Sequence, residues 1–135
     1  MAGGSALAKK LVIREDSEVL LVQAPEGFEM LLGDLPQGAS LHRPPANSSS
    51  WDVVLFFTRE STELEKQFKQ LSKTIKQNGA VWIAWPKKVS GVPTDLNGNR
   101  VREIGLEGGL VDTKVCTIDS VWSGLRFVIR LADRR

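Results

Sequence analysis

Two adjacent lysines, Lys87 and Lys88, follow the apolar segment AVWIAWP and precede a passage rich in Gly, Pro and Asn. Ammonium groups at the end of a buried strand lie at the edge of a sheet, where they can hold an anion. A tryptophan, Trp122, occupies the tight turn VWSG further along the chain, where so large a ring must pack on something. We expect it to lie beside the lysines and to make a cation–π contact with them.

Arg126 follows Trp122 by four residues and extends the same predicted edge. Its planar guanidinium can stack on the Trp122 ring or pair with Asp95 or Asp119. Lys87 could in principle be a desolvated catalytic amine, but a lysine doublet more often means solvated charge. These residues therefore favour a basic and aromatic rim that binds an acidic protein segment or a small anion.

A nucleotide-binding sheet needs glycines in the turn after its first strand, because backbone N–H groups must approach the ligand there. The corresponding turn here is QAPEGFE. Pro25 has no N–H, Glu26 brings a carboxylate to the start of the helix, and only Gly27 is suitable. The acid that would bind ribose hydroxyls after the next strand is also missing, because the sequence there is LHR, ending in Arg43. This degenerate turn disfavours S-adenosylmethionine as a cofactor and disfavours NAD still more.

Other catalytic chemistry has little support in the sequence. His42 is the only histidine, so a Ser–His–acid triad would depend on it, and no nucleophile-elbow motif is present. Cys116, the only cysteine, is predicted mid-strand, where burial raises the pKa of a thiol and leaves it inert. No Walker glycine loop precedes Lys87, and no zinc ligands cluster around Cys116. We therefore expect no catalytic residue and no metal site.

A strand–helix–strand unit over residues 51–88 must position the two lysines. The apolar runs 53–57 and 80–85 predict strands that are buried on both faces. Between them, Thr62 and Glu65 form a predicted capping box. The apolar stripe of the predicted helix consists of Leu64, Phe68, Leu71 and Ile75. Such a unit is a right-handed parallel crossover.

Asn78 and Gly79 are predicted to end this helix in a left-handed cap. The flanking sequence predicts strands at 18–23, 39–42, 111–119 and 125–131, and helices at 26–32 and from Thr94 or Asp95 to about 107. Six strands and three main helices in this order predict a three-layer α/β domain with a mostly parallel sheet. The last strand follows its neighbour through a short turn and is therefore antiparallel to it.

This arrangement resembles the class I methyltransferase version of the Rossmann fold, whose sheet ends in a reversed hairpin. The resemblance implies the spatial strand order 39–42, 18–23, 52–57, 80–85, 125–131, 111–119. One helix–strand unit is missing between residues 42 and 51. We thus expect a single truncated Rossmann-like domain, 1–135, in which residues 1–10 are either flexible or a short helix.

The composition is that of an ordinary globular chain, with 135 residues of which 41% are hydrophobic and 25% charged. A net charge of +2 argues against nucleic acid as a partner, because nucleic-acid binders usually carry a stronger basic stripe. A single cysteine fits a reducing, cytoplasmic setting. Residues 1–20 mix charges with apolar positions, so they predict neither a signal peptide nor a membrane span.

Three segments, WPKKVSGVPTDLNGNRVRE, GLVDTKVCTIDSVWSGLRF and APEGFEMLLGDLP, carry a resemblance to a known family. They are similar to small bacterial proteins classed as domain of unknown function number thirty fifty-two, over residues 11–131. The resemblance implies a cytoplasmic protein with a truncated methyltransferase-like fold and no assigned activity. When the motifs of this family are added to the residues named above, the candidate rim consists of Lys87, Lys88, Ser90, Thr94, Asp95, Trp122, Ser123 and Arg126.

Three functional hypotheses follow. The first is a non-catalytic Rossmann-like module that binds through this rim. The second is a relative of the S-adenosylmethionine-dependent methyltransferases, with a degenerate cofactor turn at Pro25, Glu26 and Gly27. The third is a weak nucleic-acid-binding module, whose binding would depend steeply on salt. The predicted edge strand 111–119 also offers a surface for pairing into a homodimer.

Overall fold

A computed structural model describes residues 4–45 and 50–134. Its helices and strands along the chain are α1 (Ala6–Lys10), β1 (Glu18–Val22), α2 (Phe28–Leu32), β2 (Ser40–His42), β3 (Trp51–Phe57), α3 (Ser61–Ser72), β4 (Ile75–Pro86), α4 (Gly98–Glu107), β5 (Leu110–Thr117) and β6 (Trp122–Ile129). Short 3₁₀ turns, η1 (Lys88–Ser90) and η2 (Leu131–Asp133), follow β4 and β6. Of the predicted N-terminal segment 1–10, residues 1–3 lie outside the described residues.

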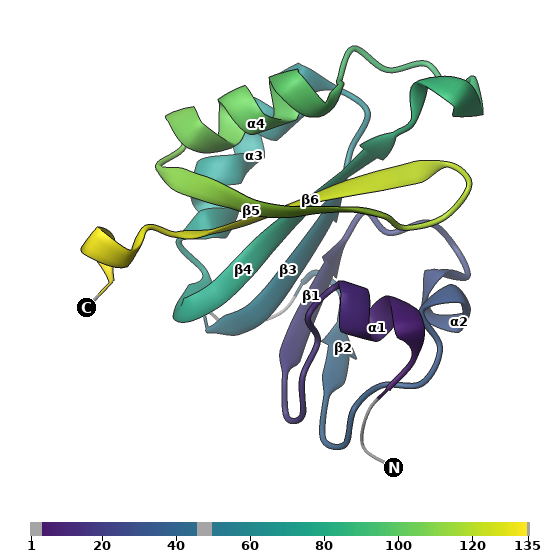
Figure 1. Ribbon diagram of the computed structural model, residues 1–135, viewed down its shortest axis with the longest axis vertical. Helices are drawn as coiled ribbons and strands as arrows, with labels where there is room; N and C mark the ends of the chain where they lie inside the picture. Colours follow the sequence, from purple (N-terminus) through teal and green to yellow (C-terminus); the bar gives the residue numbers. More distant parts are fainter. Residues whose placement is uncertain (1–3, 46–49, 135) are drawn as a thin grey trace.

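The strands form one sheet in the order β2-β1-β3-β4-β6-β5 (Figure 1). β2, β1, β3 and β4 run parallel, and β6 is antiparallel to both of its neighbours, β4 and β5. The predicted fold class and strand order are both confirmed. In the turn before β6, the Asp119 carboxylate accepts hydrogen bonds from the backbone N–H groups of Val121 and Trp122, both at 2.8 Å. These bonds set the register in which β6 returns alongside β4.

Helices cover both faces of the sheet, with α3 and α4 on one side and α1 and α2 on the other (Figure 1). Alternate residues of the central strands enter two apolar cores, because side chains on a strand point to opposite faces. Phe56 packs in the core under α3 and α4, and Phe57 packs in the core under α1 and α2. The continuous apolar runs of β3 and β4 therefore reflect burial on both sides.

Three local predictions for the α3 region were wrong. Thr62 and Glu65 make no capping box, because α3 already begins at Ser61 and its N-cap, Glu60, makes no side-chain hydrogen bond to the helix. The predicted left-handed cap at Asn78 and Gly79 lies instead inside β4. A Cβ on Gly79 would stand 2.8 Å from the carbonyl oxygen of Trp51, so the close approach of two strands explains this glycine.

Ile75 was also assigned to the helical stripe, but it starts β4 and pairs with Trp51 of β3. The next pair in the register is Val53 with Ala80, so residues 76–79 form an irregularity in the strand. Helix α4 begins later than predicted. Asn97 is its N-cap, and its side-chain oxygen accepts a hydrogen bond of 2.8 Å from the backbone N–H of Arg100.

Candidate functional site

The largest hollow at the carboxyl end of β4 contains the two lysines. We call it the β4 pocket: it has a volume of about 650 Å³ and is lined by Trp85, Pro86, Lys87, Lys88, Ser123 and all of residues 91–98. In open α/β sheets this edge is where ligands bind. The sequence prediction thus led to a real concavity, and Lys87, Lys88, Thr94, Asp95 and Ser123 of the predicted rim are brought together in it.

Hydrogen bonds within the chain hold the wall of this pocket. The backbone N–H of Lys87 donates to the carbonyl of Val121 at 2.7 Å, which ties the end of β4 to the β5–β6 turn. The Ser90 hydroxyl donates to the carbonyl of Lys87 at 2.6 Å and thereby closes η1. The Thr94 hydroxyl donates to the carbonyl of Arg59 at 2.6 Å. Each hydroxyl donates its hydrogen to a backbone carbonyl, so Ser90 and Thr94 stabilise the shape of the loop.

Asp95 links the same loop to helix α3. Its carboxylate accepts two hydrogen bonds from Ser61, one from the backbone N–H and one from the hydroxyl, each 2.8 Å long. The Ser61 hydroxyl and N–H hold the pKa of the Asp95 carboxyl below its ordinary value. Within residues 4–45 and 50–134, Asp95 forms no ion pair with either lysine, so their ammonium groups are available to a ligand.

Trp122 lies on the other side of the sheet from these lysines. Its ring packs edge-to-face on Phe57, with the ring centroids 5.1 Å apart and the planes at 87°. It lines a second hollow of about 440 Å³ with Gln23, Pro25, Thr58, Glu63 and Val92, which we call the switch pocket. Its neighbour Ser123 faces the β4 pocket, as alternation along a strand requires. Trp122 therefore packs on Phe57 and does not make the predicted cation–π contact with the lysines.

The switch pocket takes its name from its position, where the order of the strands reverses between β1 and β3. Sequence reasoning did not identify its polar residues. The Glu63 carboxylate accepts hydrogen bonds from the side-chain amide of Gln23, at 3.1 Å, and from the Thr58 hydroxyl. Only the position of Gln23 and Thr58 just after two strands could have pointed to them.

Arg126 is not brought to either pocket. It lies four residues beyond Trp122 on β6, about 13 Å along the strand at about 3.3 Å per residue. Its guanidinium donates to the Thr113 hydroxyl at 3.3 Å. The two acids proposed as its partners are engaged elsewhere, Asp95 by Ser61 and Asp119 by the backbone of its own turn.

The degenerate cofactor turn is an αL turn followed by the short helix α2. Gly27 has φ 83° and is the residue before α2, and the N–H of Phe28 donates to the carbonyl of Pro25 at 3.1 Å. Glu26, predicted to bring a carboxylate to the start of this helix, immediately precedes Gly27 and is exposed.

Arg43 stands beside this turn, just beyond β2. It forms a two-point ion pair with Glu29 of α2, at 2.8 and 2.9 Å, and also donates to the carbonyl of Ala24 at 3.3 Å. The hydrogen bonds from Arg43 lower the pKa of Glu29 below its ordinary value. A basic side chain thus lies where a ribose-binding acid would be required.

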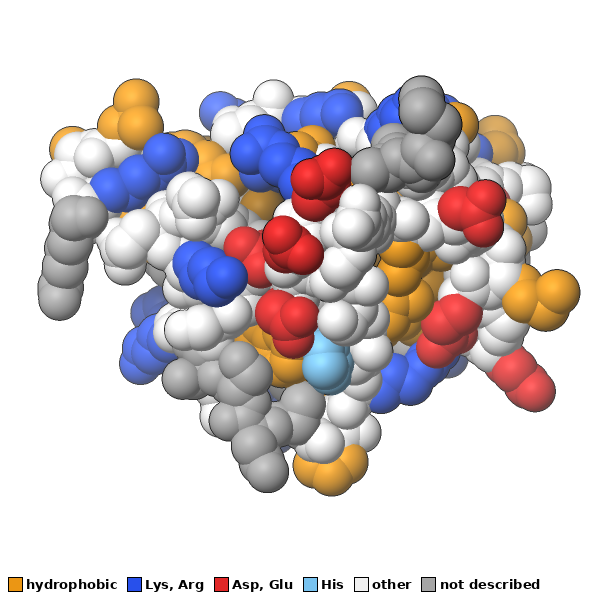
Figure 2. Space-filling view, turned by 90° about the horizontal axis from the view of Figure 1, so that it is seen from below, with side chains coloured by type: hydrophobic (Ala, Val, Ile, Leu, Met, Phe, Trp, Pro, Cys, Tyr) orange, Lys and Arg blue, Asp and Glu red, His pale blue; other side chains and the backbone are white. Residues whose placement is uncertain are grey.

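His42 is the last residue of β2, the outer strand of the sheet, and pairs with Leu20 of β1. Its Nε2 is 2.9 Å from a carboxylate oxygen of Glu18, and its ring lies 5.1 Å from that of Trp51. Figure 2 shows acidic side chains gathered beside the histidine on this face. Nearby, Lys76 pairs with Asp52 at 3.1 Å. These are contacts between strand ends, and no nucleophile partners the histidine in the part of the chain that is described.

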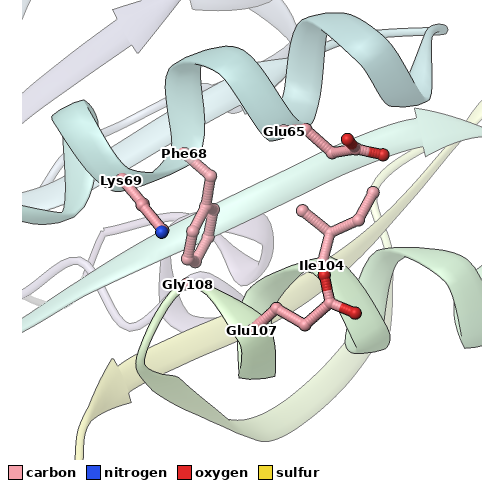
Figure 3. Close-up of a pocket in the computed structure, with 6 residues that line it drawn as sticks. All are labelled: Glu65, Phe68, Lys69, Ile104, Glu107 and Gly108. Carbon is pink, nitrogen blue, oxygen red and sulfur yellow. The ribbon is translucent and has the colours of Figure 1, made fainter.

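A smaller hollow of about 240 Å³ lies between α3 and α4, with Phe68 pointing from α3 toward the end of α4 (Figure 3). Ile104 adds a second apolar wall, and Glu65 and Glu107 stand at the edge. Glu65 pairs with Arg100. A Cβ on Gly108 would stand 2.4 Å from the Phe68 ring. This hollow is a seam between packed helices and lies away from the strand ends.

Comparisons with known proteins agree with this fold. Residues 38–131 match a family described as protein of unknown function, DUF3052. No curated protein sequence matches the chain. Among the helices of residues 4–45 and 50–134, none is long and apolar enough to cross a membrane.

Solved structures with the same fold include several methyltransferases. An S-adenosylmethionine-dependent methyltransferase from Aquifex aeolicus is 13% identical, with a TM-score of 0.71 over 92% of this chain and 88% of that one. The Methanococcus jannaschii fibrillarin pre-rRNA processing protein is 14% identical, with a TM-score of 0.61 over 93% and 75%. A chain of the Haloferax volcanii complex that contains the Trm112 methyltransferase activator is 8% identical, with a TM-score of 0.63 over 92% and 87%. At these identities the likeness shows the fold alone.

Proposed function

This chain belongs to the DUF3052 family of proteins of unknown function, and we propose that it is a non-catalytic binding module whose β4 pocket receives an acidic segment of a partner protein. The observation that carries the proposal is a concave site at the ligand edge of the sheet with two lysines at its margin. Charge complementarity of this kind directs association and selects partners.

The charge state of the pocket supports an anionic partner. Within residues 4–45 and 50–134, neither Lys87 nor Lys88 belongs to an ion pair. Asp95, the one acid among the residues that line the pocket, is held by Ser61. The positive charge of the lysines is therefore open to a carboxylate or a phosphate from outside.

An exposed apolar side chain supports a protein segment over a small anion. Val89 follows the two lysines in η1 and is 89% exposed. A peptide with acidic residues around one apolar residue would match both features, because the apolar contact adds area that a free anion lacks. A small anion remains the simpler ligand of the same chemistry, and the test below separates the two.

We propose that the module is non-catalytic because its cofactor turn, Pro25 to Gly27, is poorly suited to a nucleoside. Pro25 offers no N–H, α2 has only five residues, and the Arg43–Glu29 ion pair occupies the end of β2. A nucleoside seated there would have to displace that pair. These features support a fold that binds without a cofactor.

One observation favours a second function, a methyltransferase relative that holds S-adenosylmethionine in an unusual way. The switch pocket lies where open α/β sheets bind ligands, and it contains an aromatic wall and a carboxylate. Thermal unfolding with S-adenosylmethionine separates the two functions. Ligand at ten times its Kd would stabilise the protein by about 1.4 kcal/mol, and we expect no stabilisation at millimolar ligand.

The proposed function is tested by titrating the protein with a fluorescent peptide of glutamates around one leucine, and separately with free glutamate or citrate. We expect Lys87→Glu with Lys88→Glu to weaken peptide binding at least about tenfold, because two favourable charge contacts become repulsive. Lys66→Glu with Lys69→Glu, the same charge change on exposed α3 positions, is the matched control. Equal binding of the peptide by both double variants and the wild type would contradict the proposal. Tight binding of citrate and no binding of the peptide would assign the pocket to a small anion.

A further inference from the structure

A second group of cations meets on the face of the sheet that carries α1. Arg126 of β6 lies between Trp82 of β4 and Lys114 of β5 in the strand register. Both of these neighbours reach the end of α1: the Trp82 indole N–H donates to the carbonyl of Leu11, and the Lys114 ammonium donates to the carbonyl of Lys10, each at 2.9 Å. The segment that follows α1, which includes Arg14, therefore crosses β6 close to Arg126.

The C-terminal end of the chain approaches the same place. After β6 the Arg134 guanidinium turns back and donates to the carbonyl of Ile129, three residues beyond Arg126. The charges of Arg14 and Arg134 both act on Arg126. Burial lowers the pKa of Arg126, and these two neighbouring positive charges lower it further. Arg14, Arg126 and Arg134 thus come from distant parts of the sequence and lie near enough for their charges to interact.

Arg126 is incompletely satisfied in this position. Its Nε is buried without a hydrogen-bond partner, while another nitrogen of the same guanidinium donates to Thr113 at 3.3 Å at the surface. In the described residues, no ion pair involves any of the cations gathered here, Lys10, Arg14, Lys114, Arg126 and Arg134. By contrast, Arg43, Lys76, Arg100 and Arg102 all have acidic partners.

Like charges around a half-buried guanidinium oppose folding unless an anion offsets them. We propose that Arg14, Arg126 and Arg134 form an anion site for the phosphate group of a small molecule, with Lys10 and Lys114 at its margin. A phosphate carries up to two charges and accepts paired hydrogen bonds from guanidinium groups, so it matches several arginines better than a single carboxylate does. The net charge of the chain is only +2, which favours a single phosphate group over the backbone of a nucleic acid.

The test measures binding of inorganic phosphate and pyrophosphate by calorimetry and by thermal unfolding, in low salt. We expect both anions to raise the melting temperature of the wild type. Arg126→Gln and Arg14→Gln are each expected to weaken pyrophosphate binding about tenfold or more, the loss of one charge-assisted hydrogen bond. Without ligand, Arg14→Gln is expected to melt no lower than the wild type, because it removes repulsion. Arg59→Gln, an exposed arginine that follows the central strand β3 and lines the switch pocket, is the matched control and keeps full binding.

Several outcomes would overturn the inference. Pyrophosphate that binds wild type, Arg14→Gln and Arg59→Gln equally well is held elsewhere or without specificity. Arg14 is exposed, so its variant remains informative even where Arg126→Gln fails to fold. Loss of pyrophosphate binding in the Lys87→Glu, Lys88→Glu variant but not in Arg14→Gln would place the anion in the β4 pocket. Binding of a mixed-sequence RNA that Arg14→Gln abolishes, with no binding of pyrophosphate, would replace the small phosphate with a nucleic acid.

Discussion

Asp95 caps helix α3 from outside the helix, through hydrogen bonds of 2.8 Å to both the backbone N–H and the hydroxyl of Ser61. The N-cap residue itself, Glu60, makes no such bond. A carboxylate at a helix N-terminus also interacts favourably with the helix dipole. Because Asp95 belongs to the loop that walls the β4 pocket, the two bonds fix helix and pocket together.

Asp95→Ala is therefore expected to lower the melting temperature near neutral pH and to weaken binding in the β4 pocket. Ser61 lowers the pKa of Asp95 in the folded protein, so the stabilisation is complete above the pKa of the unfolded chain, about 3.9, and is lost as the pH falls through the lower folded pKa. The difference in melting temperature between wild type and variant should shrink in acid. Ser61→Ala keeps the N–H donor and should have the smaller effect. Equal melting of Asp95→Ala and wild type at pH 7 would contradict this role.

Gly105→Ala is expected to destabilise the protein although alanine favours helices. A Cβ at this position would stand 2.0 Å from the buried ring of Phe127, so α4 must move away from β6. Overpacking of this kind costs about 1 to 3 kcal/mol, which exceeds the gain in helix propensity of about 1 kcal/mol. Urea unfolding measures the change in the free energy of unfolding.

Gly98→Ala is the matched control for that substitution, in the first turn of the same helix. Its Cβ would stand 3.7 Å from Trp85, an ordinary contact, so the variant should be neutral or stabilised by up to about 1 kcal/mol. The same loss of stability in both variants would mean that the close approach of α4 to Phe127 is not what excludes alanine.

Cys116 is expected to react slowly with alkylating reagents. Burial raises the pKa of its thiol, more than the nearby charges of Lys114 and Lys10 lower it. Only the thiolate is nucleophilic, so the rate of iodoacetamide modification at pH 7.5 should fall below that of free cysteine, whose pKa is about 8.5, and should rise with pH. Modification faster than free cysteine would instead indicate an activated thiol.

Pairing of two copies through β5 stays a prediction. β5 is the outer strand of the sheet and Val115 on it is 65% exposed. However, the register is irregular between Asp112 and Lys114, and such bulges commonly protect an edge from pairing. Light scattering decides between monomer and dimer. Val115→Lys should convert a β5-paired dimer to a monomer, and a dimer that survives this change is built on another surface.

The fold could be predicted from the sequence further than the site could. Apolar runs at β3 and β4 and the short turn before β6 were enough for the fold class and for the reversed last strand, whereas the strand order followed from the resemblance to class I methyltransferases. The end of α3 was misjudged because Leu71 and Ile75 continue a helical spacing although Ile75 pairs with Trp51 in the sheet. A tertiary contact decided that boundary.

The candidate site could be predicted only in part, because tertiary contacts decide where several of its residues lie. Lys87, Lys88 and Ser123 do share one pocket. Trp122 and Arg126 lie on the opposite face of β6 from Ser123 and therefore face the α1 side. Which face each residue takes depends on the register in which β6 pairs with β4. That register is set by the hydrogen bonds of Asp119, and spacing alone does not reveal it. The cap from Asp95 to Ser61 joins residues far apart in the sequence and leaves no local signal.

The central claim is that the β4 pocket binds an acidic segment while the cofactor turn stays empty of nucleosides. Backbone amide NMR of the labelled protein tests it most directly, with the acidic peptide and S-adenosylmethionine added in turn. The peptide should shift the amides of Lys88, Val89 and Ser123, and S-adenosylmethionine should leave those of Gln23 and Gly27 unchanged. Saturable shifts at Gln23 and Gly27 with S-adenosylmethionine, and none at Lys88 with the peptide, would contradict the claim and favour a methyltransferase relative.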